Sequence, residues 1–173
     1  MNIDLQVTKW VQDRATVGLD TFMTLVSGIG DWRIFTTIAL LLSLVLIIYK
    51  KQKDAWIMLL TTTSAYVLVN TLKLLIKRPR PDSSMVTVYK EYLDYSFPSA
   101  HVVMYTVFFG ILMHLTKKHI KKTIWRMPLM ILAFIPIMIV GYSRIYLGAH
   151  WLTDVVAGHL LGLIMILIWS RLK

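Results

Sequence analysis

The feature that most constrains this chain is a series of five long apolar segments, separated by short polar or basic ones. The apolar segments cover about residues 32–49, 55–76, 98–115, 127–142 and 150–169. A transmembrane α-helix needs roughly 17–25 predominantly apolar residues to cross the hydrocarbon core of a bilayer. The segments are close to this length, so the sequence predicts an all-α integral membrane bundle of about five transmembrane helices. Pro136 is expected to kink the fourth.

Composition supports a single domain embedded in the membrane. The chain has 173 residues, of which 57% are hydrophobic, whereas soluble domains usually contain about 45–50% apolar residues. We find no internal repeat, linker or low-complexity segment, and we predict one domain over residues 1–173 with the helical bundle at 32–171. The absence of cysteine excludes disulfides and thiolate metal sites.

The first 30 residues predict one amphipathic helix that lies in the membrane interface. Their apolar side chains recur at helical spacing: Val7, Val11, Ala15, Leu19, Phe22 and Val26. Charged residues interrupt any continuous apolar core, which argues against a signal peptide: Lys9, Asp13, Arg14 and Asp20. The pattern ends at Gly28, Gly30 and Asp31. The alternative is a solvent-exposed helix packed against the bundle.

The distribution of charge predicts the orientation of the chain. The net charge is +10, but the bases lie in short clusters between apolar segments, which is typical of membrane-protein loops and argues against a nucleic-acid partner. With five spans, three basic clusters fall on one side: residues 50–53, 117–126 and 171–173. The positive-inside rule makes that side cytoplasmic. The loop 77–97 and the turn 143–150 are then expected on the extracytoplasmic face of the plasma membrane.

Three short segments with chemically useful side chains meet at that extracytoplasmic face. The cationic side chains Lys73, Arg80 and Arg144 are suited to neutralising the oxygens of a phosphate. The third apolar segment starts at Pro98-Ser99-Ala100-His101. Free amides at a helix N-terminus favour anions. We therefore expect Ser99 and the amides of Ala100 and His101 to complete a phosphate-binding site.

The pair His150 and Asp154 predicts a nucleophile for this site. Residues four apart share one helix face, so Asp154 can accept a hydrogen bond from one ring nitrogen of His150 and leave the other free to attack. His150 would attack phosphorus to form a phosphohistidine. His101 would protonate the leaving oxygen and then activate water. No metal or other cofactor is expected, because the cationic side chains already neutralise the phosphate charge.

Each part of this constellation has a plainer interpretation when taken alone. His150 and Asp154 could form a structural hydrogen bond or half of a metal site, and His101 could cap its helix. We assign Lys77 and Arg78 as interfacial anchors. The alternative functions are a catalytically weak phospholipid-binding or lipid-translocating protein, and a structural membrane protein with basic anchors. The two histidines and the aspartate favour an enzyme, because binding alone needs only the bases.

The same segments resemble the motifs of the type 2 phosphatidic acid phosphatase superfamily of membrane lipid phosphatases. The family's K-x6-R-P matches Lys73 to Arg80-Pro81, its P-S-G-H matches residues 98–101, and its S-R-x5-H-x3-D matches Ser143-Arg144, His150 and Asp154. The resemblance, to the short bacterial members, implies the roles given above. Ala100 stands where the family has glycine, and this weakens activity only if phosphate binding requires a positive φ.

The resemblance also limits the substrate to a lipid phosphate or diphosphate. Undecaprenyl diphosphate and phosphatidylglycerophosphate are expected, with phosphatidate as a further candidate. The loop 77–97 carries candidate headgroup-selecting residues, and the alternative for them is a solvated lid: Tyr89, Glu91, Tyr92, Asp94 and Tyr95. In the fifth segment, Gly158 and Gly162 predict close helix packing. His159 is expected to pack or to contact a lipid headgroup rather than to react. The oligomeric state is left open.

Overall fold

The computed structural model describes residues 3–30 and 32–171. The regular structure of these residues is entirely helical: α1 (Ile3–Gln12), α2 (Val17–Ile29), α3 (Trp32–Ile48), α4 (Gln52–Ile76), α5 (Ala100–His119), α6 (Thr123–Tyr146) and α7 (Leu152–Ser170). The predicted all-α class is confirmed. Asp31 and Lys173, assigned above to the helix break and to a basic cluster, lie outside the described residues.

Four helices, α4 to α7, are long and apolar enough to cross a membrane. A fifth span results if α2 and α3, which meet at an angle of 54°, are counted as one bent span. The expected number of about five transmembrane helices is therefore confirmed. Helix α6 continues through Pro128 and Pro136.

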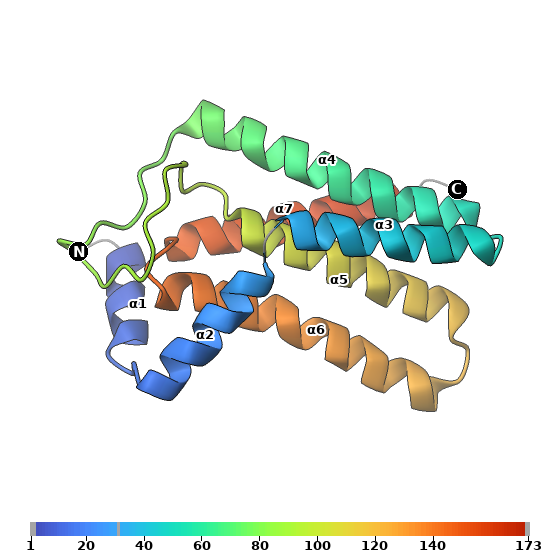
Figure 1. Cartoon of the computed structure of the whole chain (residues 1–173), viewed down its shortest axis with the longest axis horizontal. Coiled ribbons are helices and arrows are strands. Elements are labelled where there is room, and N and C mark those ends of the chain that lie inside the picture. The colour runs from blue at the N-terminus through green and yellow to red at the C-terminus, as the bar shows by residue number, and fades with distance from the viewer. Residues whose placement is uncertain (1–2, 31, 172–173) are drawn as a thin grey trace.

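The N-terminal segment forms two helices, and the expectation of a single helix is corrected. The chain turns after α1, and Thr16 then caps α2 by accepting the N–H of Leu19 at 3.3 Å. Helix α1 packs on α6 and α7, whereas α2 packs on α6. Both lie at one end of the bundle, with α2 running obliquely to the long helices (Figure 1). The two helices therefore cover the end at which α6 finishes and α7 begins.

Helix α5 is the central helix of the bundle. It packs against α3, α4, α6 and α7. Among the four helices that can each cross a membrane alone, α5 has the largest buried share. Its contact with α7 is close: a Cβ atom added to Gly158 would lie 3.0 Å from Val102, and one added to Gly162 would lie 2.7 Å from Thr106. The predicted small-residue packing is confirmed, and it fixes the spacing between the starts of α5 and α7.

Large apolar side chains cover the outer surface of the long helices. Examples that are more than half exposed are Leu41, Leu75, Ile131 and Leu167. Soluble proteins rarely expose apolar surface on this scale. A bilayer would cover these side chains, as the predicted membrane bundle requires.

The loop between α4 and α5 is held in place by the two N-terminal helices. Gln12 of α1 donates to the carbonyl oxygens of Thr87 at 2.7 Å and of Tyr146 at 2.9 Å. The Tyr89 hydroxyl donates to Asp20 of α2 at 2.6 Å. Figure 1 shows this loop and the α6–α7 turn at the same end of the bundle, as predicted. Hydrogen bonds thus tie this loop to both N-terminal helices, while most side chains of residues 82–95 are exposed. The alternative of a solvated lid therefore stays a prediction.

Candidate active site

A pocket of about 240 Å³ lies where α4, α5 and the α6–α7 turn meet beneath this loop. Six of the residues predicted for the site line it: Lys73, Arg80, Ala100, His101, Arg144 and His150. The remaining two, Ser99 and Asp154, are fully buried, and the main-chain N–H of Ser99 donates to the carbonyl oxygen of Asp154 at 3.2 Å. The structure thus brings together all eight predicted residues from three separate segments of the chain.

His150 and Asp154 meet through the start of α7 and not through a shared helix face. His150 lies in the turn before α7, and Trp151 is the N-cap residue of that helix. The Asp154 carboxylate accepts the Trp151 N–H at 2.9 Å, which is the geometry of a helix cap. Its Oδ2 atom lies 3.6 Å from Nδ1 of His150. The two side chains are neighbours as predicted, but 3.6 Å is too long for the direct hydrogen bond that was expected between them.

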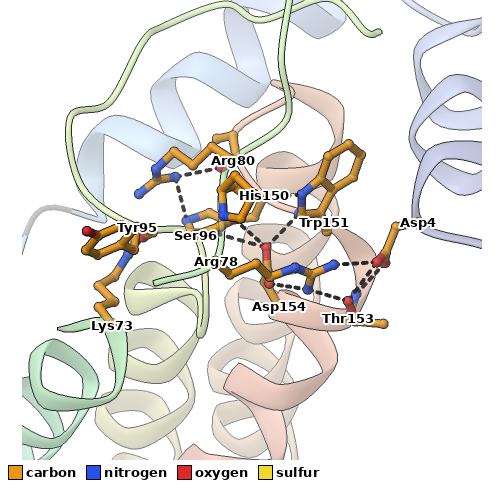
Figure 2. A network of polar contacts seen from close by, with 12 residues as sticks. Asp4, Lys73, Arg78, Arg80, Tyr95, Ser96, His150, Trp151, Thr153 and Asp154 are labelled. Carbon is orange, nitrogen blue, oxygen red and sulfur yellow. Dashed lines mark hydrogen bonds and ion pairs between the residues drawn. The ribbon is translucent and has the colours of Figure 1, made fainter. Parts of the chain in front are cut away.

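Ser96 connects the two members of this pair and was missed by the sequence analysis. Its hydroxyl donates to Asp154 Oδ2 at 2.5 Å, and its Oγ atom lies 3.4 Å from His150 Nδ1 (Figure 2). Ser96 is completely buried. The motifs quoted above do not include this serine, and no pattern in the sequence marks it.

The contacts of His150 assign its tautomer. Arg80 Nη1 lies 3.1 Å from Nε2 of His150, and a guanidinium can only donate, so Nε2 is an acceptor and the ring proton is on Nδ1. Burial, followed by the positive charges of Arg144 and Arg80, holds the pKa of His150 well below its ordinary value. The imidazole is therefore neutral at pH 7 with a lone pair on Nε2, as a nucleophile requires.

Arg144 is fully buried and only partly hydrogen-bonded. Its Nη1 atom donates to the Ser27 hydroxyl and, at 3.2 Å, to the Tyr92 hydroxyl. Its Nε and Nη2 atoms have no hydrogen-bond partner among the described residues. Leaving charged donors unpaired in a protein interior is costly, so such groups usually have a partner. An anion in the pocket that Arg144 lines would provide one.

Lys73 and Arg80 share one carboxylate, which comes from the loop. Asp94 lies 2.9 Å from Lys73 Nζ and 2.6 Å from Arg80 Nη2. Lys73 also donates to the carbonyl oxygen of Tyr95. Burial acts to raise the pKa of Asp94, but the hydrogen bond from Lys73 and the charges of both cations outweigh it and lower the pKa to about 2. Asp94 is therefore an anion bound by two predicted phosphate-binding side chains.

Helix α5 begins at the pocket, with Ser99 as its N-cap residue. The Ser99 hydroxyl is buried without a hydrogen-bond partner among the described residues. Ala100 is the first residue of the helix, and the described non-glycine residues with positive φ are Lys50 and Lys77 only. The alanine in the family's glycine position is thus not in the left-handed region and carries no backbone strain. His101 lines this pocket and a neighbouring one.

The assignment of Arg78 as an interfacial anchor is wrong. Its guanidinium lies 2.6 Å from Asp154 Oδ1 and 2.6 Å from Asp4 Oδ2, and only 25% of the side chain is exposed. Lys77 is exposed, so its assignment as an anchor stays a prediction. His159 hydrogen-bonds Thr106 at 3.0 Å between α7 and α5, in agreement with the packing role expected for it.

The charged side chains of the pocket favour an anion over a metal ion. Lys73, Arg80 and Arg144 line it, and Asp94 is the one carboxylate among its lining residues. Within residues 3–30 and 32–171, no three His, Asp or Glu side chains are grouped to hold a metal. The expectation of metal-independent chemistry stays a prediction.

Comparison with protein families identifies the chain. The family model of the PAP2 superfamily matches residues 54–173, a range that contains all three motifs and every predicted site residue. The chain belongs to the PAP2 superfamily. The resemblance found in the sequence is therefore confirmed over more than half of the protein.

Two curated proteins are similar to this chain over most of their length. Phosphatidylglycerophosphatase B of Bacillus subtilis is 29% identical over 153 residues, which cover 85% of this chain and 71% of the relative. An undecaprenyl-diphosphatase of Sulfolobus acidocaldarius is 27% identical over 165 residues, covering 94% and 74%.

Two crystal structures share the fold. A transmembrane PAP2 type phosphatidylglycerolphosphate phosphatase from Bacillus subtilis superposes with a TM-score of 0.87 and 25% identity, covering 98% of this chain and 87% of the other. LpxE of Aquifex aeolicus superposes with a TM-score of 0.79 and 25% identity, covering 99% and 96%. The bundle described here is thus the fold of transmembrane PAP2 phosphatases.

Proposed function

We propose that this PAP2 protein is a membrane lipid phosphatase that hydrolyses a lipid phosphate or diphosphate through a phosphohistidine. Two nitrogens of the buried Arg144 have no hydrogen-bond partner among the described residues, and the pocket that Arg144 lines also contains the unprotonated Nε2 of the neutral His150. This combination is the observation that carries the proposal. A phosphate placed there would satisfy the first and be attacked by the second.

The phosphate is bound by cations and by the start of α5. Lys73, Arg80 and Arg144 contact its non-bridging oxygens, and Ser99 with the first amides of α5, including that of Ala100, adds hydrogen bonds. This arrangement stabilises the negative charge that the oxygens carry in the transition state. The buried, partnerless Ser99 hydroxyl supports this role.

In the first step, Nε2 of His150 attacks phosphorus while the bond to the leaving oxygen breaks. His101 donates a proton to that oxygen. The imidazole becomes positively charged, and Asp154 stabilises it, directly or through Ser96. In the second step, His101 takes a proton from water, the resulting hydroxide attacks phosphorus, and the N–P bond breaks to release phosphate and restore His150.

A lipid substrate is supported by the deep wall of the pocket. Tyr66, Val69 and Met104 line it one to two helical turns inside the bundle from the cationic residues. The named relatives act on phosphatidylglycerophosphate and undecaprenyl diphosphate, and we propose one of these as the substrate. The alternative is a catalytically weak phospholipid-binding or lipid-translocating protein that uses the same pocket.

We place the pocket on the extracytoplasmic face of the plasma membrane. The basic segments 50–53 and 117–126 lie at the opposite end of the bundle. The positive-inside rule assigns that end to the cytoplasm. A tag in the segment 117–126 that can be labelled from outside intact cells would reverse this orientation.

The function is tested by phosphate release from a lipid panel in detergent: a polyprenyl diphosphate, phosphatidylglycerophosphate and phosphatidate, each with and without EDTA. We expect release that EDTA leaves unchanged and that His150→Ala abolishes. A substrate labelled at the transferred phosphorus should leave label on the wild-type protein after a rapid acid-free quench. Release that persists in His150→Ala would refute the nucleophile, loss with EDTA would refute metal independence, and binding without release would favour the alternative function.

A further inference from the structure

Arg78 differs from the neighbouring cations because it faces away from the pocket. Lys73 and Arg80 line the pocket, whereas Arg78 is not among its lining residues. Its Nη1 atom donates to Asp154 Oδ1 and to the Thr153 hydroxyl, each at 2.6 Å (Figure 2). Arg78 therefore reaches the proposed catalytic residues from outside the pocket, through the Asp154 carboxylate that supports His150.

The two carboxylate oxygens of Asp154 have different hydrogen-bond partners. Oδ2 accepts from Ser96 at 2.5 Å and from the Trp151 N–H at 2.9 Å, on the side of His150. Oδ1 is held by Arg78 at 2.6 Å. The carboxylate is completely buried, so a charged partner and hydrogen bonds have to replace the water it lacks. Arg78 supplies the charged partner at Oδ1.

Asp4 of α1 holds Arg78 from the other side. Its Oδ2 atom lies 2.6 Å from Arg78 Nη2 and accepts the Thr153 hydroxyl at 2.9 Å, while its Oδ1 accepts the Thr153 N–H at 2.9 Å. Asp4 is only 3% exposed. A short N-terminal helix far from the family motifs is thereby tied to Thr153 in the first turn of α7, three residues after the pocket histidine.

We propose that Arg78 and Asp4 are positioning residues for the phosphatase reaction. Arg78 orients Asp154 through Oδ1, so that Oδ2 faces Ser96 and His150, and Asp4 fixes the Arg78 guanidinium in that orientation. Neither residue contacts the substrate. This inference rests on the proposed function, because it concerns how well His150 is oriented for attack.

The test compares the turnover of purified variants in detergent. Arg78→Gln removes the charge and shortens the side chain, which donates through Nη1 to Asp154 and through Nη2 to Asp4. We expect kcat to fall by about 10- to 100-fold, since misplacing a reacting group by about 1 Å can cost that much. KM and inhibition by inorganic phosphate should change less than about threefold, because the pocket cations remain. Lys77→Gln, an equal change of charge at the exposed neighbour, should leave kcat and KM unchanged.

Rescue by a conservative variant separates positioning from a general loss of structure. Arg78→Gln removes the charge that faces Asp154, whereas Arg78→Lys keeps that charge and should restore part of kcat. Asp4→Asn should lower kcat in the same manner, and the double variant should be no worse than Arg78→Gln alone, because both act through Asp154.

The outcomes distinguish this inference from the proposed function. If wild-type protein releases no phosphate from any lipid, the proposed function fails. If the wild type is active and both Arg78→Gln and Asp4→Asn keep wild-type kcat, or lose activity only through KM, the positioning role is refuted. If Arg78→Gln does not fold, Arg78→Lys and Asp4→Asn decide by the same criterion.

Discussion

The Asp94 carboxylate lies 2.9 Å from the ammonium of Lys73, inside the pocket that is proposed to bind phosphate. The same carboxylate lies 2.6 Å from Arg80. A substrate phosphate would have to replace it, because both cations are among the groups expected to bind the phosphate oxygens. Asp94 thus occupies the place of an anionic ligand, and its side chain, 54% exposed, can leave toward solvent.

The first prediction is that Asp94→Asn binds phosphate more tightly. Removal of the competing charge should lower KM for the lipid substrate, and the inhibition constant of inorganic phosphate, by about 3- to 10-fold. With a pKa of about 2, Asp94 is ionised from pH 5 to 9, so the gain should be constant over that range. Steady-state kinetics with phosphate as inhibitor provides the measurement. Asp82→Asn, the same change of charge at an exposed residue of the same loop, should behave as wild type, and a higher KM in Asp94→Asn would contradict the prediction.

The second prediction concerns the protonation of His150. Its lowered pKa keeps the imidazole neutral below pH 6.5, so the acid limb of kcat/KM that belongs to the enzyme should lie below that pH. The ionisation of the substrate phosphate is measured separately and subtracted. An acid limb of enzymatic origin at or above pH 6.5 would show that His150 is protonated too readily for this mechanism.

The same lowered pKa has a consequence for stability. As the pH falls through 6.5, the unfolded chain takes up a proton that folded His150 does not, so the free energy of unfolding decreases until the pH passes the pKa of the folded state. Thermal unfolding between pH 7 and 5 measures this slope. His150→Gln cannot take up that proton and should show a weaker dependence on pH.

The long helices could be predicted because apolar periodicity and length are local properties of the sequence. The break between α1 and α2 was missed because Val11, Ala15 and Leu19 continue the apolar face across it. The capping by Thr16 ends that continuity. The hydrophobic pattern alone therefore predicted one helix, whereas the hydrogen bond at Thr16 starts a second helix.

The pocket residues could be predicted because membrane topology brings the ends of helices together, whatever the loop does. The supporting contacts could not. Asp4 meets Thr153 across 149 residues, and Ser96 meets Asp154 across 58. Such polar pairs depend on how loops fold over the bundle and leave no periodic signal. Lys73 and Arg80 were placed correctly, but their pairing with Asp94 depends on the same loop.

The third prediction is that Ser96→Ala lowers turnover. Loss of the hydroxyl removes a 2.5 Å hydrogen bond from Asp154 and leaves the Nδ1–H of His150 without its nearest oxygen. An unsatisfied buried group costs about 1–3 kcal/mol, which corresponds to roughly a 5- to 100-fold lower kcat if the cost falls on the transition state. KM should change little. Ser83→Ala, at an exposed serine of the same loop, serves as the control, and wild-type kcat in Ser96→Ala would exclude a role for Ser96.

The fourth prediction contrasts two substitutions on neighbouring helices. Ala100→Gly restores the residue of the family motif, but Ala100 needs no positive φ, so kcat and KM should stay at wild-type values. The expected cost is at most about 1 kcal/mol of stability from the helical preference of alanine.

Gly158→Ala should be harmful, although it adds only a methyl group. The new Cβ would lie 3.0 Å from Val102 and 3.2 Å from the carbonyl oxygen of Ser99, so these neighbours must shift by a few tenths of an ångström. Overpacking of this kind costs about 1–3 kcal/mol. It also strains the 3.2 Å hydrogen bond between Ser99 and Asp154, which joins the starts of the two helices. We expect a lower unfolding temperature together with a lower kcat. Higher activity in Ala100→Gly, or unchanged stability in Gly158→Ala, would show that the start of α5 is not fixed as described.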